Sequence, residues 1–318
     1  MRKPAFATKD LLPPGGDVTL IYCVGYETRS GFVTNADPWR SARSAAIVYG
    51  QRQVASFTDN LERARARGHE LWDDDRTKIG DRVAEFVVGG RAKGCRHFAV
   101  DVSAMDRGLM AAVLLSAIET VAPNESLHIL YAPSRFQDRD TQLLPIRQFG
   151  AAHVALTGKL SEPKPSTCLV IGLGFEYGVS LNIMDMHDPD STFAFVAEAI
   201  DPQFDEAVKR ANFDFDFGNN NVSIIHYPLR SPVFLMDNII SSLRPLQNSK
   251  IIIAPMGPKI FSACCIVSSY LYFEDATLLR YSVGHEDDAY DVFASGEIIG
   301  LTMLRLDKSN QADSDTAQ

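Results

Sequence analysis

The stretch "VTLIYCVGYETRS" (18–30) places an uninterrupted apolar run directly before a glycine, an aromatic ring and a carboxylate. Much later, "STCLVIGLGFEYGVS" (166–180) repeats this order, so that Gly25-Tyr26-Glu27 falls on Gly174-Phe175-Glu176 at an offset of 149 residues. Apolar, β-branched runs of this kind are typical of strands that are buried on both faces of a parallel sheet. The two stretches therefore predict two equivalent strands, each followed by a glycine turn and a carboxylate.

Further matches between the two halves follow in the same order. The aligned segments are 46–48 with 195–197 at an offset of 149, 98–100 with 251–253 at 153, and 129–131 with 279–281 at 150. The segments 147–160 and 293–306, which close the two halves, also resemble each other. Helical patterns separate the apolar runs, which is typical of parallel sheets. We therefore predict an α/β fold of two tandem Rossmann-like three-layer units with mostly parallel sheets, related by internal duplication.

The predicted units are residues 1–156 and 157–307. The junction falls in "LTGKLSEPKPST" (156–167), whose proline, serine and lysine content is typical of a linker. The last residues, 308–318, are polar and acidic, and we expect them to form a disordered tail.

Composition and charge exclude several classes of function. The 318 residues include 31 Lys plus Arg and 40 Asp plus Glu, a net charge of −9, which argues against bulk binding of nucleic acid. The five cysteines lack the spacing of a metal site, and we expect buried, reduced thiols in a cytoplasmic protein. Neither a signal peptide nor a long apolar span is present, so we expect no membrane association. The sequence indicates no metal site and identifies no cofactor.

Ligands of open α/β sheets bind beyond the carboxyl ends of the strands, and the first such end carries Gly25, Tyr26, Glu27, Arg29 and Ser30. Gly25 would allow an unusual φ or the close approach of a ligand. Glu27 could accept ribose hydroxyls or act as a base, while Arg29 could clamp a phosphate or a carboxylate. Alternatively, Glu27 caps a helix and Arg29 pairs with it on the surface.

A second candidate is "DVSAMDRG" (101–108), where a strand runs into an apolar helix. Asp101 and Ser103 end the strand, and Asp106 and Arg107 open the helix, whose free amides would attract an anion. Two carboxylates and an arginine could equally orient a sugar. Alternatively, Ser103 or Asp106 caps the helix and satisfies those amides without a ligand.

The second half offers Gly174 and Glu176 after its first strand, and Gly257 and Lys259 in "APMGPK" (254–259). Lys259 could reach a phosphate as a point charge. Gly178 and Val179 stand where the first half has arginine and serine. If only one half is active, we therefore expect it to be the first.

The duplicated pattern over residues 18–284 resembles the CARF and SAVED domains of prokaryotic defence systems, Rossmann-like units that sense cyclic or oligomeric nucleotides. In those families the ligand loops follow the first strand and a later strand that runs into a helix. The matching segments in this chain are 25–30, 101–103 and 255–259. The resemblance implies a small nucleotide ligand. Since no nuclease, HEPN or membrane effector module is recognisable, it also implies a component that works with a protein partner or as a homo-oligomer.

Three functions stay open at this point. The chain is a nucleotide-binding or nucleotide-sensing component of a prokaryotic defence or regulatory assembly. Alternatively, it is a nucleotide or nucleoside hydrolase, a glycosidase or phosphohydrolase, in which Glu27, Glu176 or Asp101 serves as nucleophile or general base. A third possibility is a protein-interaction subunit whose α/β units bind no ligand.

Overall fold

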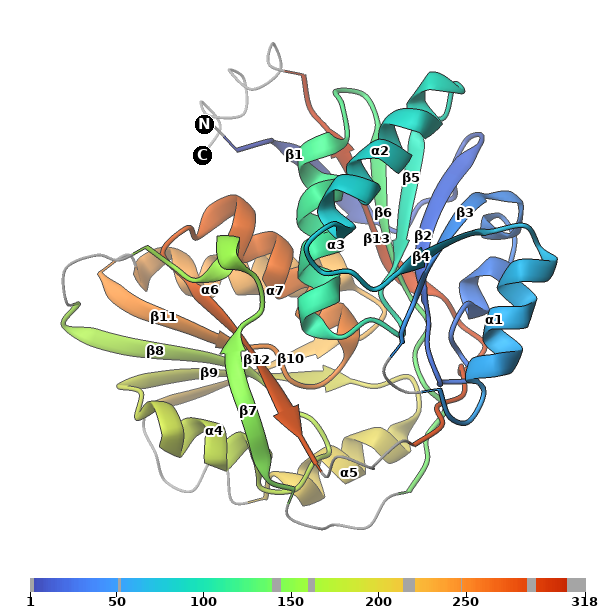
Figure 1. The fold of residues 1–318 in the computed structure, drawn as a ribbon. Coiled ribbons are helices and arrows are strands. Elements are labelled where there is room, and N and C mark those ends of the chain that lie inside the picture. Colours follow the sequence, from blue (N-terminus) through green and yellow to red (C-terminus); the bar gives the residue numbers. More distant parts are fainter. Residues whose placement is uncertain are drawn as a thin grey trace. The chain divides into compact units, whose positions relative to one another are not determined.

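The chain folds into two compact units, each with a mostly parallel sheet and flanking helices (Figure 1). The computed structural model describes residues 3–50, 53–138, 144–159, 164–213, 221–246, 248–284 and 290–307. Unit 1 comprises Met1–Ser134 and Ala289–Gln318, and unit 2 comprises Arg135–Asp288. The predicted α/β class with two mostly parallel sheets is confirmed.

Unit 1 contains a seven-stranded sheet in the order β1-β13-β6-β5-β2-β3-β4. Its strands are β1 (Phe6–Asp10), β2 (Val18–Val24), β3 (Arg43–Val48), β4 (Glu70–Asp73), β5 (His97–Asp101), β6 (Ser126–Tyr131) and β13 (Ile299–Arg305). The five strands from β2 to β6 are parallel, whereas β13 runs antiparallel to both β6 and β1. All seven residues of β2 are buried, as its apolar run predicts for a central strand.

Helices cover both faces of this sheet. They are α1 (Phe57–Ala66), α2 (Ile79–Ala92) and α3 (Arg107–Thr120), with the short 3₁₀ turns η1 (Phe32–Asn35) and η2 (Trp39–Ser41). Alternate β2 residues face α1 and the 3₁₀ turns: Tyr22 packs in one cluster with Phe57 of α1, and Leu20 packs in another with Val33 and Trp39. Helices α2 and α3 pack together, and nine residues of α3 are buried.

Unit 2 repeats this arrangement with a six-stranded sheet in the order β10-β9-β8-β11-β12-β7. Its strands are β7 (Ile146–Ala151), β8 (Ser166–Gly172), β9 (Ser191–Glu198), β10 (Val222–Pro228), β11 (Ser249–Ala254) and β12 (Thr277–Val283). Its helices are α4 (Val179–His187), α5 (Pro202–Ala211), α6 (Pro232–Leu243) and α7 (Lys259–Tyr272), with the short turns η3 (Val154–Leu156) and η4 (Arg244–Leu246). Beginning at β4 and at β10, the two sheets have the same order of five parallel strands followed by one antiparallel strand. The same order of strands is expected if the two units are copies of one unit.

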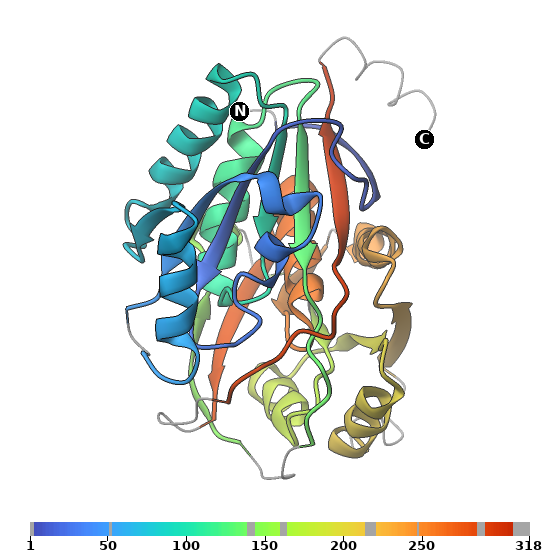
Figure 2. The ribbon, with the colours of Figure 1, turned by 90° about the vertical axis from the view of Figure 1, so that its right-hand side faces the viewer.

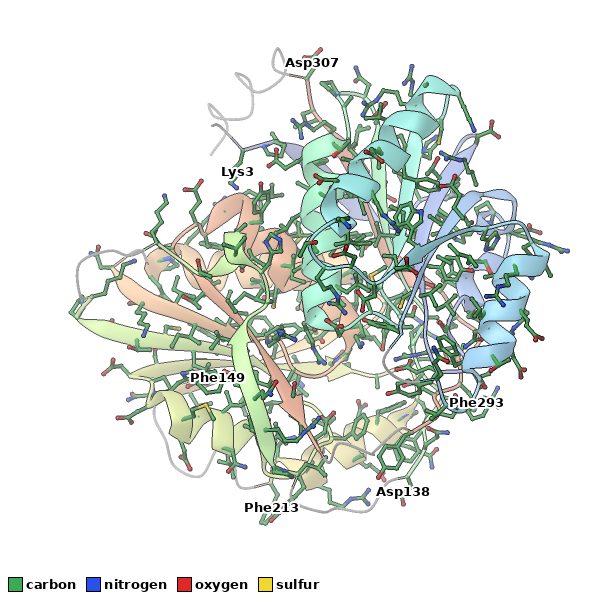
Figure 3. All side chains as sticks on the ribbon, viewed as in Figure 1. Lys3, Asp138, Phe149, Phe213, Phe293 and Asp307 are labelled. Atoms are coloured by element: carbon green, nitrogen blue, oxygen red, sulfur yellow. The ribbon has the colours of Figure 1, made fainter. Side chains whose placement is uncertain are left out.

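The antiparallel strand of each sheet comes from the other half of the chain. Strand β7 follows β6 in sequence but pairs with β12, and β13 follows β12 but pairs with β6. Figure 2 shows β13, in red, beside β6, in green. In unit 2, the exposed ring of Phe149 on β7 stacks on Tyr281 of β12 with 5.9 Å between ring centroids (Figure 3).

This exchange of strands explains why the compact units differ from the predicted division at 156/157. A division by sequence assigns β7 to the first half and β13 to the second, whereas their hydrogen bonds assign each to the opposite unit. The predicted disordered tail, 308–318, lies outside the described residues.

The strand register corrects the sequence alignment by single residues. Ala46 pairs with Tyr22 in unit 1, and Ala194 pairs with Ile171, the counterpart of Tyr22, in unit 2. The offset between β3 and β9 is therefore 148, and not 149. Strands buried on both faces have no alternation of polar and apolar residues, so their sequences do not reveal the phase of a match.

The sequence pattern does not reveal strand β4. The segment 58–72, with an N-cap signal at Thr58 or Asp59, predicts one helix, but α1 ends at Ala66 and β4 begins at Glu70. Gly68 has a φ of 68°, the left-handed conformation that ends helices, and it signals the boundary.

All five cysteines are buried and unpaired, in agreement with the prediction of buried, reduced thiols. Across the described ranges, no helix combines the length and apolarity needed to cross a bilayer.

The pairing of β13 with β6 yields a stability prediction. A Cβ at Gly300 of β13 would lie 2.0 Å from the carbonyl oxygen of Ile129 in β6, whereas a Cβ at Gly150 of β7 would meet nothing within 4 Å. We expect Gly300→Ala to lower the free energy of unfolding of unit 1 by about 2 kcal/mol or more, and Gly150→Ala to change stability by less than about 0.5 kcal/mol.

Denaturant unfolding followed by tryptophan fluorescence measures this effect, because the two tryptophans of the chain, Trp39 and Trp72, are both buried in unit 1. Equal effects of the two substitutions would contradict the role assigned to β13.

Candidate functional site

The candidate site of unit 1 lies where the strand order reverses. The chain passes from β2 outward to β3 and β4, and then crosses to β5 on the other side of β2. The loop 25–30 follows β2 and the segment 102–106 follows β5, so the two flank the switch point at which α/β sheets bind ligands. The residues that the sequence singles out in unit 1 thus follow the two strands that flank this switch point.

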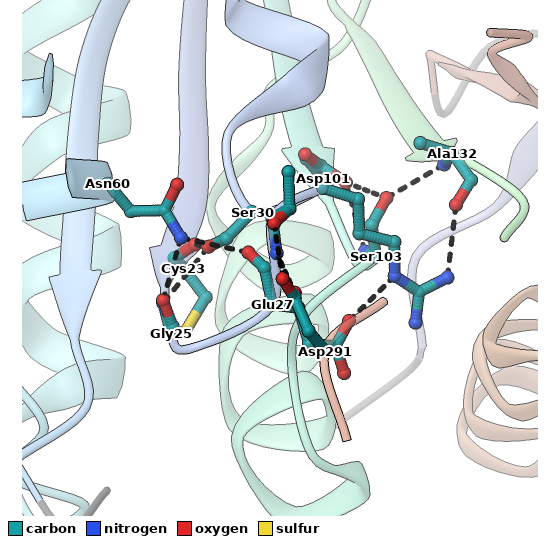
Figure 4. A network of polar contacts seen from close by, with 11 residues as sticks. Cys23, Gly25, Glu27, Ser30, Asn60, Asp101, Ser103, Ala132 and Asp291 are labelled. Atoms are coloured by element: carbon teal, nitrogen blue, oxygen red, sulfur yellow. Dashed lines mark hydrogen bonds and ion pairs between the residues drawn. The ribbon is translucent and has the colours of Figure 1, made fainter. Parts of the chain in front are cut away.

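Loop 25–30 is held by hydrogen bonds to its own backbone and to α1. Asn60 of α1, only 3% exposed, donates its side-chain amide to the carbonyls of Gly25 (2.9 Å) and Glu27 (2.8 Å). The Gly25 amide donates to Ser30 Oγ (2.9 Å), which donates to the Cys23 carbonyl (2.5 Å). Ser30 therefore closes the loop, as Figure 4 shows.

Gly25 adopts no left-handed φ, contrary to one explanation that the sequence suggests. A Cβ there would lie 3.5 Å from the Tyr49 ring, an ordinary contact, so folding does not require glycine at this position. The other explanation, close approach of a ligand to the Gly25 backbone, stays a prediction. Tyr26 packs against the cluster of Tyr22 and Phe57 beneath α1 and contributes to the core.

Arg29 is buried and engaged. Its Nε donates to Glu27 Oε2 (2.6 Å), its NH1 donates to the carbonyl of Ala132 (3.2 Å) at the end of β6, and its side chain is 7% exposed. Burial alone would lower the pKa of Arg29, but the Glu27 carboxylate and Tyr131 raise it above its ordinary value. Arg29 therefore ties loop 25–30 to β6. In the Glu27–Arg29 pair the arginine is buried, whereas the carboxylate keeps 14% of its side chain exposed.

Asp101, at the end of β5, is fully buried beside Ser103. Both the amide of Ser103 (2.9 Å) and its hydroxyl donate to Asp101 Oδ1, and Ser103 Oγ accepts from the Ala132 amide (2.7 Å). Burial raises the pKa of Asp101 to about 6, although the hydrogen bonds from Ser103 and the charge of Arg29 act in the opposite direction. The end of β5 and the end of β6 therefore share one polar network (Figure 4).

Asp291 completes this network and was missed by sequence reasoning. Its carboxylate accepts from the amide and the hydroxyl of Thr28, both at 2.6 Å, and from the hydroxyl of Ser56 at 3.4 Å. Next to it, the carbonyl of Val292 accepts from the Arg29 amide (2.9 Å). Nothing local marks Asp291, because it lies 263 residues from Thr28 and reaches the loop only through the return of the chain to β13.

Asp106 caps α3, as one of the interpretations of "DVSAMDRG" predicts. Its Oδ1 accepts from the amides of Gly108 (2.8 Å) and Leu109 (2.9 Å), so the side chain occupies the place of an anion. Arg107 is the first residue of the helix. Burial raises the pKa of Asp106, but hydrogen bonding and the charge of Arg76 outweigh this effect and hold it well below its usual range.

Sequence reasoning also missed two partners of Asp106. Arg76 donates to both Asp106 oxygens (3.2 and 2.6 Å), and the hydroxyl of Tyr49 donates to Oδ2 (2.9 Å) while it accepts from the Asp106 amide (2.7 Å). Arg76 is 38% exposed and Asp106 is 44% exposed, so this ion pair faces solvent. Since Tyr49 also lies beside Gly25, the pair adjoins the loop.

In unit 2 the predicted residues also lie together at the ends of β8 and β11. A Cβ at Gly174 would lie 2.2 Å from Glu176 Oε2 and 3.5 Å from the Gly257 amide nitrogen. Gly257 has a φ of 72°, which favours glycine, and Lys259 begins α7. Asn212 donates to the Gly174 carbonyl (2.7 Å), as Asn60 does to Gly25.

The two units differ in the polarity of their strand ends. Ala254, the last residue of β11, stands where Asp101 ends β5, and Met256 follows where unit 1 has Ser103. Gly178 takes the place of Arg29 in the loop after β8. Unit 2 therefore retains the glycine and the carboxylate but lacks the buried arginine, aspartate and serine. Among the described residues of the whole chain, no group of three potential ligands could hold a metal ion.

No family model matches the chain, and no curated protein matches it. Solved structures are similar to it at low identity. One, titled "Structure of a Type III CRISPR defence DNA nuclease activated by cyclic oligoadenylate", has a TM-score of 0.48 and 7% identity over 85% of this chain and 68% of that chain. A universal stress protein from Archaeoglobus fulgidus DSM 4304 has a TM-score of 0.23 and 10% identity over 85% of this chain and 97% of that chain. Likenesses at this level carry no conclusion about function.

The raised pKa of Asp101 predicts a pH-dependent contribution to stability. Because its pKa is 3.8 in the unfolded chain and about 6 in the folded protein, the folded state binds more protons between these values, and stability falls as pH rises from 4 to 6. Asp101→Asn removes this dependence. The free energy of unfolding of the variant, relative to that of wild type, should therefore rise by on the order of 3 kcal/mol as the pH rises through this range. Urea unfolding at pH 4, 5, 6 and 7 measures the difference, and parallel profiles would contradict the assignment.

Proposed function

We propose that the chain is a nucleotide-binding component that takes its ligand at the crevice between the carboxyl ends of β2 and β5 in unit 1. The observation that carries this proposal is the polar network of Glu27, Arg29, Asp101 and Ser103 at the switch point. Buried charges cost free energy even when paired. Since unit 2 builds the same strand order with Ala254 and Met256 at those positions, folding alone does not account for the network.

The groups at this edge suit a nucleotide. Glu27, with 14% of its side chain exposed, and the exposed Asp106 offer acceptors for ribose hydroxyls or for the amino groups of a base. Arg76 is the more exposed guanidinium, because Arg29 is buried against Glu27, and a phosphate there would compete with Asp74 and Asp106 for its donors. In this arrangement Arg29 and Asp101 position the loop, and the phosphate-clamping role that the sequence suggests for Arg29 passes to Arg76.

The resemblance of loops 25–30 and 101–103 to CARF and SAVED domains supports cyclic or oligomeric nucleotides as the class of ligand. It also supports a sensing role within a prokaryotic defence or regulatory assembly. The hydrolase alternative requires a carboxylate that can act as nucleophile or base on substrate. In unit 1, Asp101 is only 2% exposed and the Glu27 carboxylate is paired with Arg29 (2.6 Å). Binding is therefore the function that the geometry supports best.

A thermal-shift screen with mono-, di- and cyclic nucleotides tests the proposal. A nucleotide at 100 times its Kd should stabilise the wild-type protein by about 2.7 kcal/mol. Glu27→Gln and Asp101→Asn should abolish this stabilisation. Glu70→Gln is the matched control, because Glu70 pairs with Arg43 (2.5 Å) on the surface of the same unit.

The proposal fails if no nucleotide stabilises the protein, or if Glu27→Gln and Asp101→Asn respond like Glu70→Gln. Chromatography of the same mixtures after incubation detects turnover, which would favour the hydrolase.

The comparison of units gives a second test. Glu176→Gln makes the equivalent change in unit 2, which lacks the buried arginine and aspartate. We expect it to retain the nucleotide-induced stabilisation in full. Loss of the response in Glu176→Gln alone would move the site to unit 2.

A further inference from the structure

Unit 1 contains a second concave site, on the side of loop 25–30 that faces α1. It encloses about 250 Å³ of empty space, including the solvent at its mouth. Its walls come from β2, the turn η1 and helix α1, and the side chains with polar groups in it are Tyr22, Ser30, Thr34, Asn35, Asn60, Arg63 and Arg67. The pocket is shallow and open to solvent, too small to enclose a whole nucleotide.

The notable feature of this pocket is a pair of arginines without a carboxylate partner. Arg63 lies in the last turn of α1 and Arg67 is its C-cap residue four residues on, a spacing at which like charges repel each other. In the described part of the chain their hydrogen bonds go to neutral oxygens only. Arg67 donates to the carbonyl (2.9 Å) and hydroxyl (2.8 Å) of Thr34 and to Asn35 Oδ1, and Arg63 donates to Asn60 Oδ1 (2.5 Å) and to the Asp59 carbonyl (3.2 Å).

Most other arginines of unit 1 whose contacts are described above or below differ in this respect. A carboxylate pairs with each of five: Arg29, Arg43, Arg76, Arg91 and Arg96. Arg305 instead donates to the Ile118 carbonyl (3.1 Å) and lies over the Phe6 ring. A guanidinium has five N–H donors, so Arg63 and Arg67 keep donors for a further acceptor after the bonds named above. Their neutral partners Asn60 and Thr34 are themselves buried, at 3% and 5% exposure, and hold the two guanidiniums at the pocket.

Both charges act on the same point of the pocket. Burial raises the pKa of the Tyr22 hydroxyl, and the charge of Arg67 acts to lower it. The charge of Asp101 acts to raise this pKa, and the charge of Arg63 acts to lower it. The Tyr22 hydroxyl bonds His69 Nδ1 (2.9 Å), and burial together with the charge of Arg67 lowers the pKa of His69. The groups that face the pocket are thus two cations, neutral amides and hydroxyls, which is the composition of an oxyanion site.

We propose that this pocket binds a phosphate group, held by Arg63 and Arg67 with the hydroxyl and amide groups around them. The site uses none of the charged residues of the β2–β5 crevice, so it stands whether or not a nucleotide binds there. The phosphate is either the free ion or the phosphate of a phosphorylated ligand, since the guanidiniums recognise the same oxygens in both.

Isothermal titration with inorganic phosphate in a phosphate-free buffer tests the site, with sodium chloride at matched ionic strength as the reference for screening. We expect saturable binding by the wild-type protein, about tenfold weaker in Arg63→Gln and in Arg67→Gln, and lost in the double variant. Arg65→Gln is the matched control: it makes the same change of charge on the same helix, but Arg65 does not line the pocket. It should bind phosphate as the wild-type protein does.

Two further variants separate the possible reasons for a loss of binding. Arg67→Lys keeps the charge but lacks the planar fork, and should bind more weakly than wild type but more tightly than Arg67→Gln. Asp101→Asn removes a negative charge that acts on Tyr22 and should bind phosphate at least as tightly as wild type, which separates this site from the nucleotide crevice. Melting temperatures without phosphate identify any variant that has lost its fold.

The proposal is overturned if wild type shows no saturable binding of phosphate at millimolar concentrations. It is also overturned if Arg65→Gln loses as much affinity as Arg63→Gln, because binding would then reflect only the charge of α1. Parallel titrations with adenosine monophosphate and adenosine identify the source of the phosphate. A phosphorylated ligand is indicated if the protein binds adenosine monophosphate but not adenosine, and if Arg63→Gln weakens the binding of the monophosphate. The free ion is indicated if inorganic phosphate binds more tightly than adenosine monophosphate.

Discussion

The antiparallel pairing of β13 with β6 is the constraint on which unit 1 depends. Within its sheet, strand β1 is hydrogen-bonded only to β13. The pairing of β13 with β6 therefore joins both β1 and β13 to the five parallel strands. The close approach of Gly300 to the Ile129 carbonyl gives the pairing its specificity. The same return of the chain delivers Asp291 and Val292 to Thr28 and Arg29. The segment that closes the sheet therefore also orders the loop beside the switch point.

The network around Arg29 shows how a buried charge is tolerated there. Arg29 has an ionic partner in Glu27 and a carbonyl partner in Ala132, while the hydroxyl of Ser103 both donates to Asp101 and accepts from Ala132. Because nearly every donor has an acceptor within the network, displacing one member would leave others unsatisfied in a medium of low dielectric. These hydrogen bonds therefore stabilise one conformation of loop 25–30, as a preorganised binding loop requires.

Much of the fold could be predicted from the sequence because central parallel strands carry long apolar runs. The repeat of glycine, aromatic ring and carboxylate correctly equates β2 with β8, while the assignment of a ligand site to the strand ends stays a prediction. What failed depends on long-range contacts. The exchange of β7 and β13 is decided by pairing between distant segments, and the exact register is invisible in strands without alternation. That the halves descend from one duplicated unit stays a prediction.

Within the site, residue types were easier to predict than roles. Glu27, Arg29, Asp101 and Ser103 do meet, but which of them face solvent depends on burial, which one sequence does not reveal. Arg29 at a strand end has the same sequence signature as an exposed phosphate clamp, whereas Arg76 sits in a polar run that is typical of a plain surface. Only their different exposure, 7% against 38%, separates the two.

Asn60 joins the two candidate sites of unit 1 through the orientation of a single amide. Its Oδ1 accepts from Arg63 in the phosphate pocket, and its Nδ2 donates to the carbonyls of Gly25 and Glu27 in the loop. If the amide were rotated by half a turn, its oxygen would face two carbonyls and its nitrogen would face a guanidinium, so all three bonds would be lost together. The position of Arg63 therefore biases the amide that holds loop 25–30. An anion that fixes Arg63 would strengthen this bias, and an ordered loop would in turn favour the same position of Arg63, because such coupling is reciprocal.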